Sequence, residues 1–152
     1  MKRIHLCTGI LERDGHILLV SSRYRNHPGP LWNLPGGRQE PYELLEVTLS
    51  REFDEEISMP VEIERVAYVA ESFDRSTETQ FTNVAFVVRS SAEPKLRAGD
   101  LHAVDFAWVP RANVAERLVA AVVRTPLMGF LGGREGAYYG FADADITVEF
   151  ND

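Results

Sequence analysis

Three glutamates, Glu52, Glu55 and Glu56, are spaced so that they could bind one divalent cation. They lie in a stretch, residues 44–56, that has no Gly or Pro and is rich in helix formers, so the sequence predicts a helix there. At about 100° per residue, Glu52 and Glu56 fall within about 20° of Leu45, on the apolar side. Carboxylates that face the protein repel one another unless a cation lies between them, and oxygen ligands suit Mg²⁺ or Mn²⁺. A solvated acidic helix end is the alternative that these residues leave open.

The rest of the predicted helix indicates which side faces the core. Leu45, Leu49 and Phe53 form one apolar stripe, whereas Asp54 and Val47 project from the opposite side. An ordinary amphipathic helix would place all of its acids on the side of Asp54. The inward acids therefore need a reason, and a bound cation supplies one.

The residues around these acids form a longer pattern with fixed spacing. The order is G-x5-E-x7-R-E-U-x-E-E, where U is apolar, and Trp32-Asn33-Leu34-Pro35-Gly36 leads into it. The fixed residues are Gly37, Glu43, Arg51, Glu52, Phe53, Glu55 and Glu56. This pattern resembles the signature of the Nudix hydrolases, the MutT-like family, over Gly37 to Met59, a segment called the box below. Ser58 stands where the family has a glycine, at a position where a left-handed turn is expected, and this departure removes no ligand.

The resemblance implies a fold and a reaction. The fold is an α/β/α sandwich of the α+β class, with a mixed β-sheet between helices, and we expect residues 1–152 to form a single Nudix domain. The reaction is metal-dependent attack of water on a phosphorus of a nucleoside diphosphate linked to another group, that is, a pyrophosphohydrolase. The box would form a loop-helix-loop that binds Mg²⁺ or Mn²⁺.

The resemblance also implies a role for each fixed polar residue. Glu52 and Glu56 would be the leading metal ligands, and the Gly37 carbonyl would be another. Glu55 would be a third ligand or the base that activates water, so Glu55 and Glu56 are the expected catalytic acids. Glu43 and Arg51 would pair with each other and hold the loop against the helix.

Substrate contacts are expected from residues outside the fixed positions. Arginines suit bidentate contacts to phosphate, and aromatic rings stack on bases, although most such residues are solubilising or part of the core. The phosphate candidates are Arg23, Arg25, His27 and Arg38. The stacking candidates are Trp32, which adjoins the box, and Tyr24, Phe73 and Phe81. Some family members carry a further acid or base in a later loop, and Glu78, Asp100 and His102 are open candidates.

The elements that must position these residues follow from the local patterns. We expect strands over residues 3–11, 17–20, 61–69, 81–88 and 104–108, with a turn at 13–16. Residues 26–37 are rich in Gly and Pro and residues 71–80 are polar, so both are expected to be loops. A second helix is expected from Asn113 to about Arg124, ended by Thr125-Pro126. The tail alternates at Ile146, Val148 and Phe150, which predicts a last strand, while Tyr138 and Tyr139 would add a strand or a dimer contact.

Composition limits the classes of protein. The chain has 152 residues, with 45% hydrophobic and 26% charged residues, which indicates one globular domain. Its net charge of −7 argues against binding a nucleic-acid polymer but leaves a small phosphorylated ligand open, because a metal ion can bridge acids to phosphate. The single cysteine, Cys7, excludes an internal disulfide and is expected to be buried. No apolar run is long enough to span a membrane and no secretory signal is evident, so a cytoplasmic location is expected.

Two other functions are weighed against hydrolysis. A non-catalytic nucleotide-sensing domain of the same fold would usually have lost one of the acids or the arginine, whereas all four glutamates and Arg51 are present here. An isomerase is not favoured by any feature. We therefore expect a hydrolase acting on a nucleoside triphosphate or a small nucleotide derivative, and the sequence leaves the exact substrate, the metal and a homodimer open.

Overall fold

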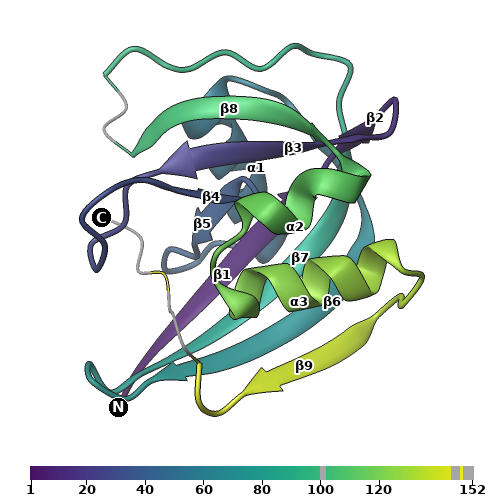
Figure 1. Cartoon of the computed structure of the whole chain (residues 1–152). Helices are drawn as coiled ribbons and strands as arrows, with labels where there is room; N and C mark the ends of the chain where they lie inside the picture. Colours follow the sequence, from purple (N-terminus) through teal and green to yellow (C-terminus); the bar gives the residue numbers. More distant parts are fainter. Residues whose placement is uncertain (100–101, 145–147, 149–152) are drawn as a thin grey trace.

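The computed structural model describes residues 1–99, 102–144 and 148, and it contains two β-sheets (Figure 1). The larger sheet has five strands in the order β5-β1-β7-β6-β9. These are β1 (Lys2–Ile10), β5 (Gly36–Arg38), β6 (Glu62–Asp74), β7 (Thr79–Arg89) and β9 (Ala137–Phe141). The smaller sheet consists of β2 (Glu12–Arg13), β3 (His16–Ser22), β4 (Leu31–Asn33) and β8 (Ala103–Pro110), with β3 between β4 and β8.

The larger sheet is mixed, as expected. β1 runs parallel to β7, and β9 runs parallel to β6, whereas β1–β5 and β6–β7 are antiparallel. The antiparallel β1–β5 ladder places Gly36 opposite Thr8 and Gly37 opposite Cys7, so the start of the box is held by the middle of β1. Cys7 is fully buried, as predicted.

The helices lie on opposite sides of the strands. Helix α1 (Leu45–Ile57) packs on β1, β5 and β8, and α3 (Ala121–Leu131) packs on β6 and β9. Between β8 and α3 lie η1 (Arg111–Asn113) and α2 (Val114–Arg117). In Figure 1, α3 crosses in front of β6 and β7, while α1 lies behind β3. The fold is the α/β/α sandwich that the resemblance implies.

Strand β3 contributes side chains to two hydrophobic cores, one on each of its faces. Ile17 and Leu19 pack into the core that includes Leu127 of α3. Leu18 and Val20 point to the other side, into the core with Phe53 of α1. Because successive strand residues face opposite sides, a run that is apolar throughout is what a strand covered on both faces requires.

Three predicted boundaries are wrong. Residues 26–37 are not one loop, because they contain β4 and β5, whose backbone groups bond to β3 and β1. The loop at 71–80 is shorter than expected, because β6 continues to Asp74 and β7 begins at Thr79. The second helix does not end at Thr125-Pro126. It breaks after Arg117, and α3 then runs through Pro126.

Pro126 lies in α3 although proline lacks the N–H that a helix interior uses. Such a position costs about 3 kcal/mol in an exposed helix. Here Pro126 and Leu127 are both buried, so packing against the core offsets the missing hydrogen bond.

Two predictions concern the residues after α3, and the structure describes the residues of one of them. Tyr138 and Tyr139 belong to a strand, β9, which pairs with β6. The strand predicted around Ile146 and Phe150 lies outside the described residues. Val148 is described and buried, in a cluster with Tyr24 and Ala120. No helix in the described ranges is long and apolar enough to cross a membrane.

Candidate active site

The box begins on β5, where two glycines let the backbone pass close to its neighbours. A Cβ atom on Gly36 would lie 2.0 Å from the carbonyl oxygen of Cys7. A Cβ atom on Gly37 would lie 2.5 Å from the carboxylate carbon of Glu52. The Gly36 contact is with backbone and requires glycine there, whereas a side chain at Gly37 would have to displace the flexible end of Glu52. The same geometry places the Gly37 backbone against Glu52, one of the predicted metal ligands.

The pair between Glu43 and Arg51 is confirmed. Arg51 donates from Nε to Glu43 Oε2 at 2.8 Å and from Nη2 to Oε1 at 3.0 Å, a bidentate arrangement. The buried hydroxyl of Thr48 donates to the same Oε1 at 2.9 Å, and so does the Glu40 backbone N–H at 3.0 Å. The hydrogen bonds from Arg51, above all, lower the pKa of the Glu43 carboxyl from 4.5 to about 2. Nη2 of Arg51 also donates to the Arg38 carbonyl at 3.0 Å, which joins the loop to the helix.

The remaining guanidinium nitrogen of Arg51 lies among the acids of the box. Nη1 is 2.9 Å from Glu52 Oε1 and 3.4 Å from Glu55 Oε2. It therefore supplies the positive charge that adjacent carboxylates need. Of the three predicted ligand acids, Glu52, Glu55 and Glu56, Glu55 is the most exposed, with 49% of its side-chain surface accessible, against 17% for Glu52.

Glu56 faces inward, as its position on the helix predicts. Only 5% of the residue is exposed, and its Oε1 accepts the Gly36 backbone N–H at 2.9 Å. Asp54, on the opposite side of α1, is exposed and pairs with Arg97 at 3.0 Å. The helix thus buries a carboxylate against the box loop while its outward acid stays in solvent. This contrast rules out the interpretation of the acids as a uniformly solvated helix end.

The donor set fits a hard divalent cation, although the side chains are not gathered round one point. The predicted ligands, Gly37, Glu52, Glu55 and Glu56, offer only oxygen atoms, which Mg²⁺ and Mn²⁺ prefer. Among the described residues, however, no three His, Cys, Asp or Glu side chains form a ready cluster for a metal. Glu52 and Glu55 both bond to Arg51 Nη1, so this cation takes part of their bonding capacity.

Ser58 ends the helix in the left-handed conformation expected of the missing glycine. Its φ is 55° and its ψ is 37°, and its N–H bonds to the Asp54 carbonyl. The turn is therefore formed in spite of the Cβ atom, at a modest steric cost.

The predicted substrate contacts are dispersed. Trp32 is half-buried on β4, and the Arg117 guanidinium lies 5.0 Å from its ring centre, so a cation already covers part of the ring. Arg23 and Arg25 are exposed after β3, and Arg38 is half-buried at the end of β5. Tyr24 is buried and its hydroxyl accepts a bond from Asn33, so its ring is not available to a base.

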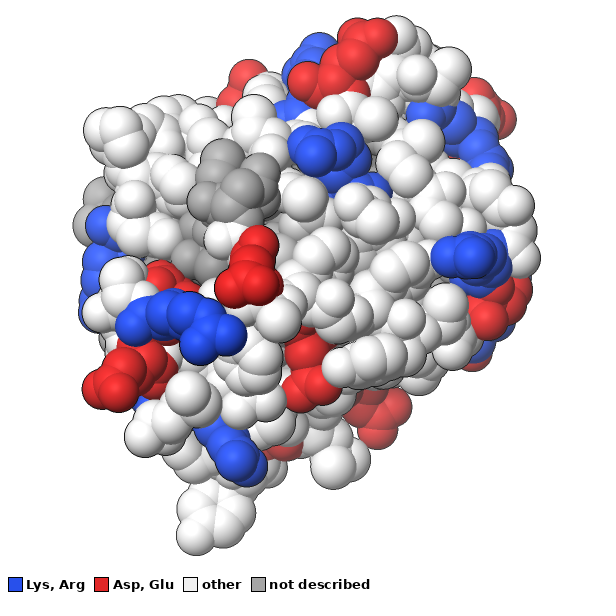
Figure 2. All heavy atoms as spheres, turned by 60° about the horizontal axis from the view of Figure 1, so that its bottom comes forward, with Lys and Arg blue, Asp and Glu red and all other residues white. Residues whose placement is uncertain are grey.

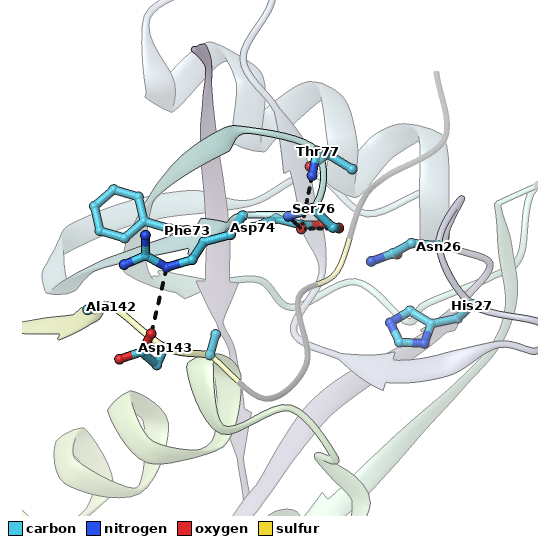
Figure 3. Close-up of a pocket in the computed structure, with 10 residues that line it drawn as sticks. Asn26, His27, Phe73, Asp74, Ser76, Thr77, Ala142 and Asp143 are labelled. Carbon is cyan, nitrogen blue, oxygen red and sulfur yellow. Dashed lines mark hydrogen bonds and ion pairs between the residues drawn. The ribbon is translucent and has the colours of Figure 1, made fainter.

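Phe73 and His27 line different sides of an open pocket of about 540 Å³ (Figure 3). The turn between β6 and β7 forms one wall, where Asp74 accepts the backbone N–H of Ser76. Phe81, the fourth stacking candidate, is a buried core residue. The two candidate rings therefore have different roles, and only Phe73 lines this pocket.

The two described candidates for a further catalytic group, Glu78 and His102, lie between strands, as expected. Glu78 is exposed in the β6–β7 turn, and His102 precedes β8, where its carbonyl accepts the Arg23 N–H. Asp100 lies outside the described residues. The choice among these three residues stays open.

A second cavity, which the sequence did not predict, adjoins the box. It measures about 40 Å³, and its polar lining consists of Thr8, Asn33, Ser72 and Asn83. Thr8 is the β1 residue directly opposite Gly36. No spacing in the sequence links these residues, because they come from four separate strands.

The charges on one face give no sign of a polymer-binding surface. Figure 2 shows Lys and Arg side chains lying beside Asp and Glu around a broad uncharged area, and no continuous basic stripe crosses the described part of this face. Several opposite charges of the described residues are paired, such as Arg65 with Glu135 at 2.8 Å.

Comparison with known families decides the assignment. The family model described as NUDIX domain matches residues 2–127. The chain belongs to the NUDIX family. The matched residues include the whole box and all of the strands except β9, so the Nudix signature and the sandwich coincide.

Similar proteins include solved structures and two curated relatives. A MutT NUDIX hydrolase from Burkholderia pseudomallei has the same fold, with a TM-score of 0.70 and 23% identity over 84% of this chain and 98% of that one. The "CTP pyrophosphohydrolase" of Escherichia coli K12 is 39% identical over 59 residues, 39% of this chain and 44% of that protein. The "8-oxo-dGTP diphosphatase" of Proteus vulgaris is 31% identical over 61 residues, 40% of this chain and 54% of that protein. The matches span about half the length of these curated relatives.

Proposed function

We propose that the protein is a metal-dependent pyrophosphohydrolase that cleaves a phosphoric anhydride bond in a nucleoside triphosphate or a small nucleotide derivative. The observation that carries the proposal is the arrangement of the box. Glu56 is buried against the Gly36 N–H, Glu52 lies against the Gly37 backbone, and Arg51 is fixed by Glu43. A buried carboxylate costs free energy even when it accepts a backbone N–H, so the charge of Glu56 calls for a further partner such as a cation.

The chemistry follows from these residues. Glu52, Glu55, Glu56 and the Gly37 carbonyl would hold Mg²⁺ or Mn²⁺, which polarises the phosphoryl oxygens and neutralises the departing phosphate. Water oxygen bonds to phosphorus, the bridging P–O bond breaks, and the water proton passes to a carboxylate. Glu55 is our candidate for that base, because it is the most exposed of the three predicted ligand acids, Glu52, Glu55 and Glu56, and Glu78, Asp100 and His102 are the alternatives.

The substrate class rests on the relatives. The two curated matches are named for hydrolysis of 8-oxo-dGTP and of CTP, so we propose a nucleoside triphosphate first. Arg23, Arg25, Arg38 and Trp32 stay the candidate contacts to it. We also propose that residues 1–152 form one domain, since β9 lies beyond the matched residues and still pairs with β6. The cytoplasmic location and a homodimer stay predictions.

A panel of nucleotides tests the proposal. Nucleoside triphosphates, ADP-ribose, nucleotide sugars and dinucleoside polyphosphates are incubated with Mg²⁺, Mn²⁺ or EDTA, and the products are separated by ion exchange. We expect hydrolysis of at least one compound with metal and none with EDTA. Nucleotide binding without any hydrolysis would contradict the proposal and favour the non-catalytic sensing domain.

A further inference from the structure

Tyr42, in the loop of the box, is fully exposed to solvent. Its relative exposure is 108%, against 63% for Tyr138, another exposed tyrosine of the described chain. An aromatic ring gains free energy when it packs, so a ring left in water is available to a ligand. Exposure alone does not mark a site, because single apolar residues are common on protein surfaces.

The backbone holds Tyr42 in a conformation that suits other residue types. Residues 40–43 form a β-turn, in which the Glu43 N–H donates to the Glu40 carbonyl at 3.1 Å. Pro41 is the second residue of this turn, and Tyr42 is the third with a φ of 66°, as in a type II turn. Glycine or asparagine is favoured there, because a Cβ atom is strained at positive φ. The chain therefore holds an aromatic ring in solvent at a cost to stability, which points to a role in binding.

The turn lies directly beside the acids of the box. The residues on both sides of its tip reach Arg51, with the Glu43 carboxylate at 2.8 Å and the Glu40 carboxylate at 3.8 Å. The same guanidinium lies 2.9 and 3.4 Å from two of the predicted ligand acids. Tyr42 therefore stands at the border of the site where phosphates would be held.

Two aromatic residues flank the short strand that carries the start of the box. Trp32, a candidate contact to the nucleoside, precedes β5, and Tyr42 follows it. Between them, the Gly36 N–H binds the carboxylate of Glu56. A strand is extended, so its two ends point in opposite directions. A substrate held by its phosphates at these acids can therefore place one group on each side.

The surroundings of Tyr42 select an uncharged flat group. Glu40 and Glu46 are exposed acids close to it in the chain, and they disfavour a free phosphate or carboxylate at this position. A tyrosine ring offers its face to another ring, and every nucleobase has such a face. We propose that Tyr42 stacks on a second ring of the substrate, beyond its phosphates, and so favours nucleotides with an aromatic group at both ends of the phosphate chain. This inference rests on the proposed function.

A matched pair of substrates isolates the second ring. A dinucleoside tetraphosphate and the nucleoside tetraphosphate of the same base differ by one nucleoside, and the base is the one that the nucleotide panel prefers. We measure kcat and KM for both with Mg²⁺, in the wild type, Tyr42→Gly and Tyr42→Phe. In the wild type, kcat/KM should be about fivefold or more higher for the two-ring compound. Tyr42→Gly should remove most of this preference by raising KM for that compound, and Tyr42→Phe should retain it.

Tyr138→Gly is the control, the same substitution at an exposed tyrosine of β9, which is the opposite edge strand of the larger sheet from β5 (Figure 1). It should leave the preference unchanged. Tyr42→Gly should have a urea midpoint no lower than that of the wild type, because a φ of 66° suits glycine. A lower midpoint would show that Tyr42 serves the fold and would overturn the inference.

The kinetic results decide the rest. No preference for the two-ring compound in the wild type, or the same preference in Tyr42→Gly, would overturn the inference. If no nucleotide is hydrolysed, the proposed function fails, and calorimetry with the same two compounds and Mg²⁺ decides the inference separately. It then stands only if the two-ring compound binds about fivefold or more tighter and Tyr42→Gly abolishes the difference.

Discussion

Replacing Glu43 by Gln tests whether the ion pair with Arg51 holds the box together. Glutamine keeps the size of the side chain and its oxygen, but it removes the charge that accepts the two guanidinium bonds. Arg51 is 23% exposed, so its charge would lose its main partner in a partly shielded place. We expect the variant to fold and to be less stable near neutral pH.

The magnitude follows from the pKa of Glu43. The carboxyl pKa falls from 4.5 to about 2 on folding, mainly because of the Arg51 hydrogen bonds. At about 1.4 kcal/mol for each tenfold change in proton affinity, this corresponds to about 3 kcal/mol of folding free energy. For a chain of this length such a loss lowers the melting temperature by about 6 to 12 °C. The contribution is complete above pH 4.5 and declines as the pH falls toward 2, because the carboxylate is protonated in that range.

Urea unfolding at pH 7, 5, 4 and 3, with EDTA present, measures the difference. The gap between wild type and Glu43→Gln should be about 3 kcal/mol at pH 7 and should narrow steadily below pH 4.5. Glu40→Gln is the control. Glu40 is exposed, and its carboxylate lies 3.8 Å from Arg51, too far for a hydrogen bond, so this substitution should lower the free energy of unfolding by under about 0.5 kcal/mol. A gap that does not change with pH, or an equal loss in the control, would refute the reasoning.

Three further substitutions probe the rest of the box. Ser58→Gly should raise the free energy of unfolding by about 0.5 to 1 kcal/mol, because φ is 55° there, and a lower urea midpoint would contradict this. Gly37→Ala should abolish most metal-dependent hydrolysis in a folded protein, because the alanine Cβ would lie 2.5 Å from the Glu52 carboxylate carbon and displace that side chain. Normal turnover with an unchanged circular dichroism spectrum would contradict this prediction. Thr48→Val keeps the shape of the side chain but removes the 2.9 Å hydrogen bond to Glu43, so calorimetry should show a free energy of unfolding lower by about 1 kcal/mol. Wild-type stability in this variant would show that the bond is dispensable.

The parts of the box that could be predicted depend on local geometry. Helix periodicity alone placed Glu56 inward and Asp54 outward, and both positions are confirmed. The left-handed turn at Ser58 follows from the end of the same helix. The bond between Glu43 and Arg51 could be expected from the family pattern, since both residues lie within one loop and helix.

The short strands could not be predicted, because nothing local stabilises them. β4 and β5 each have three residues in a stretch rich in Gly and Pro, and their hydrogen bonds come from β3 and β1. Likewise, the sequence around Pro126 favours a helix end, and only burial of that turn explains why α3 continues. Long-range pairing overrides local preference in each case.

The cavity beside the box was missed for a related reason. Thr8, Asn33 and Asn83 are far apart in the sequence and share no periodicity. They meet because β1 pairs with β7 and the β4 segment leads into β5, which only the topology specifies. Thr48 was also missed, since a threonine inside a helix gives no sign of a bond to Glu43.

Hydrolysis by Glu56→Gln tests the central claim most directly. Glutamine keeps the size of this 5% exposed side chain and its bond to the Gly36 N–H, but it removes the charge that a divalent cation would need. The measurement is Mg²⁺-dependent turnover of the best nucleotide, with Glu46→Gln, an exposed acid of the same helix, as the control. We expect turnover to fall by several orders of magnitude in folded Glu56→Gln and to stay normal in the control. Near-normal turnover in folded Glu56→Gln would contradict the assignment of this carboxylate as a metal ligand.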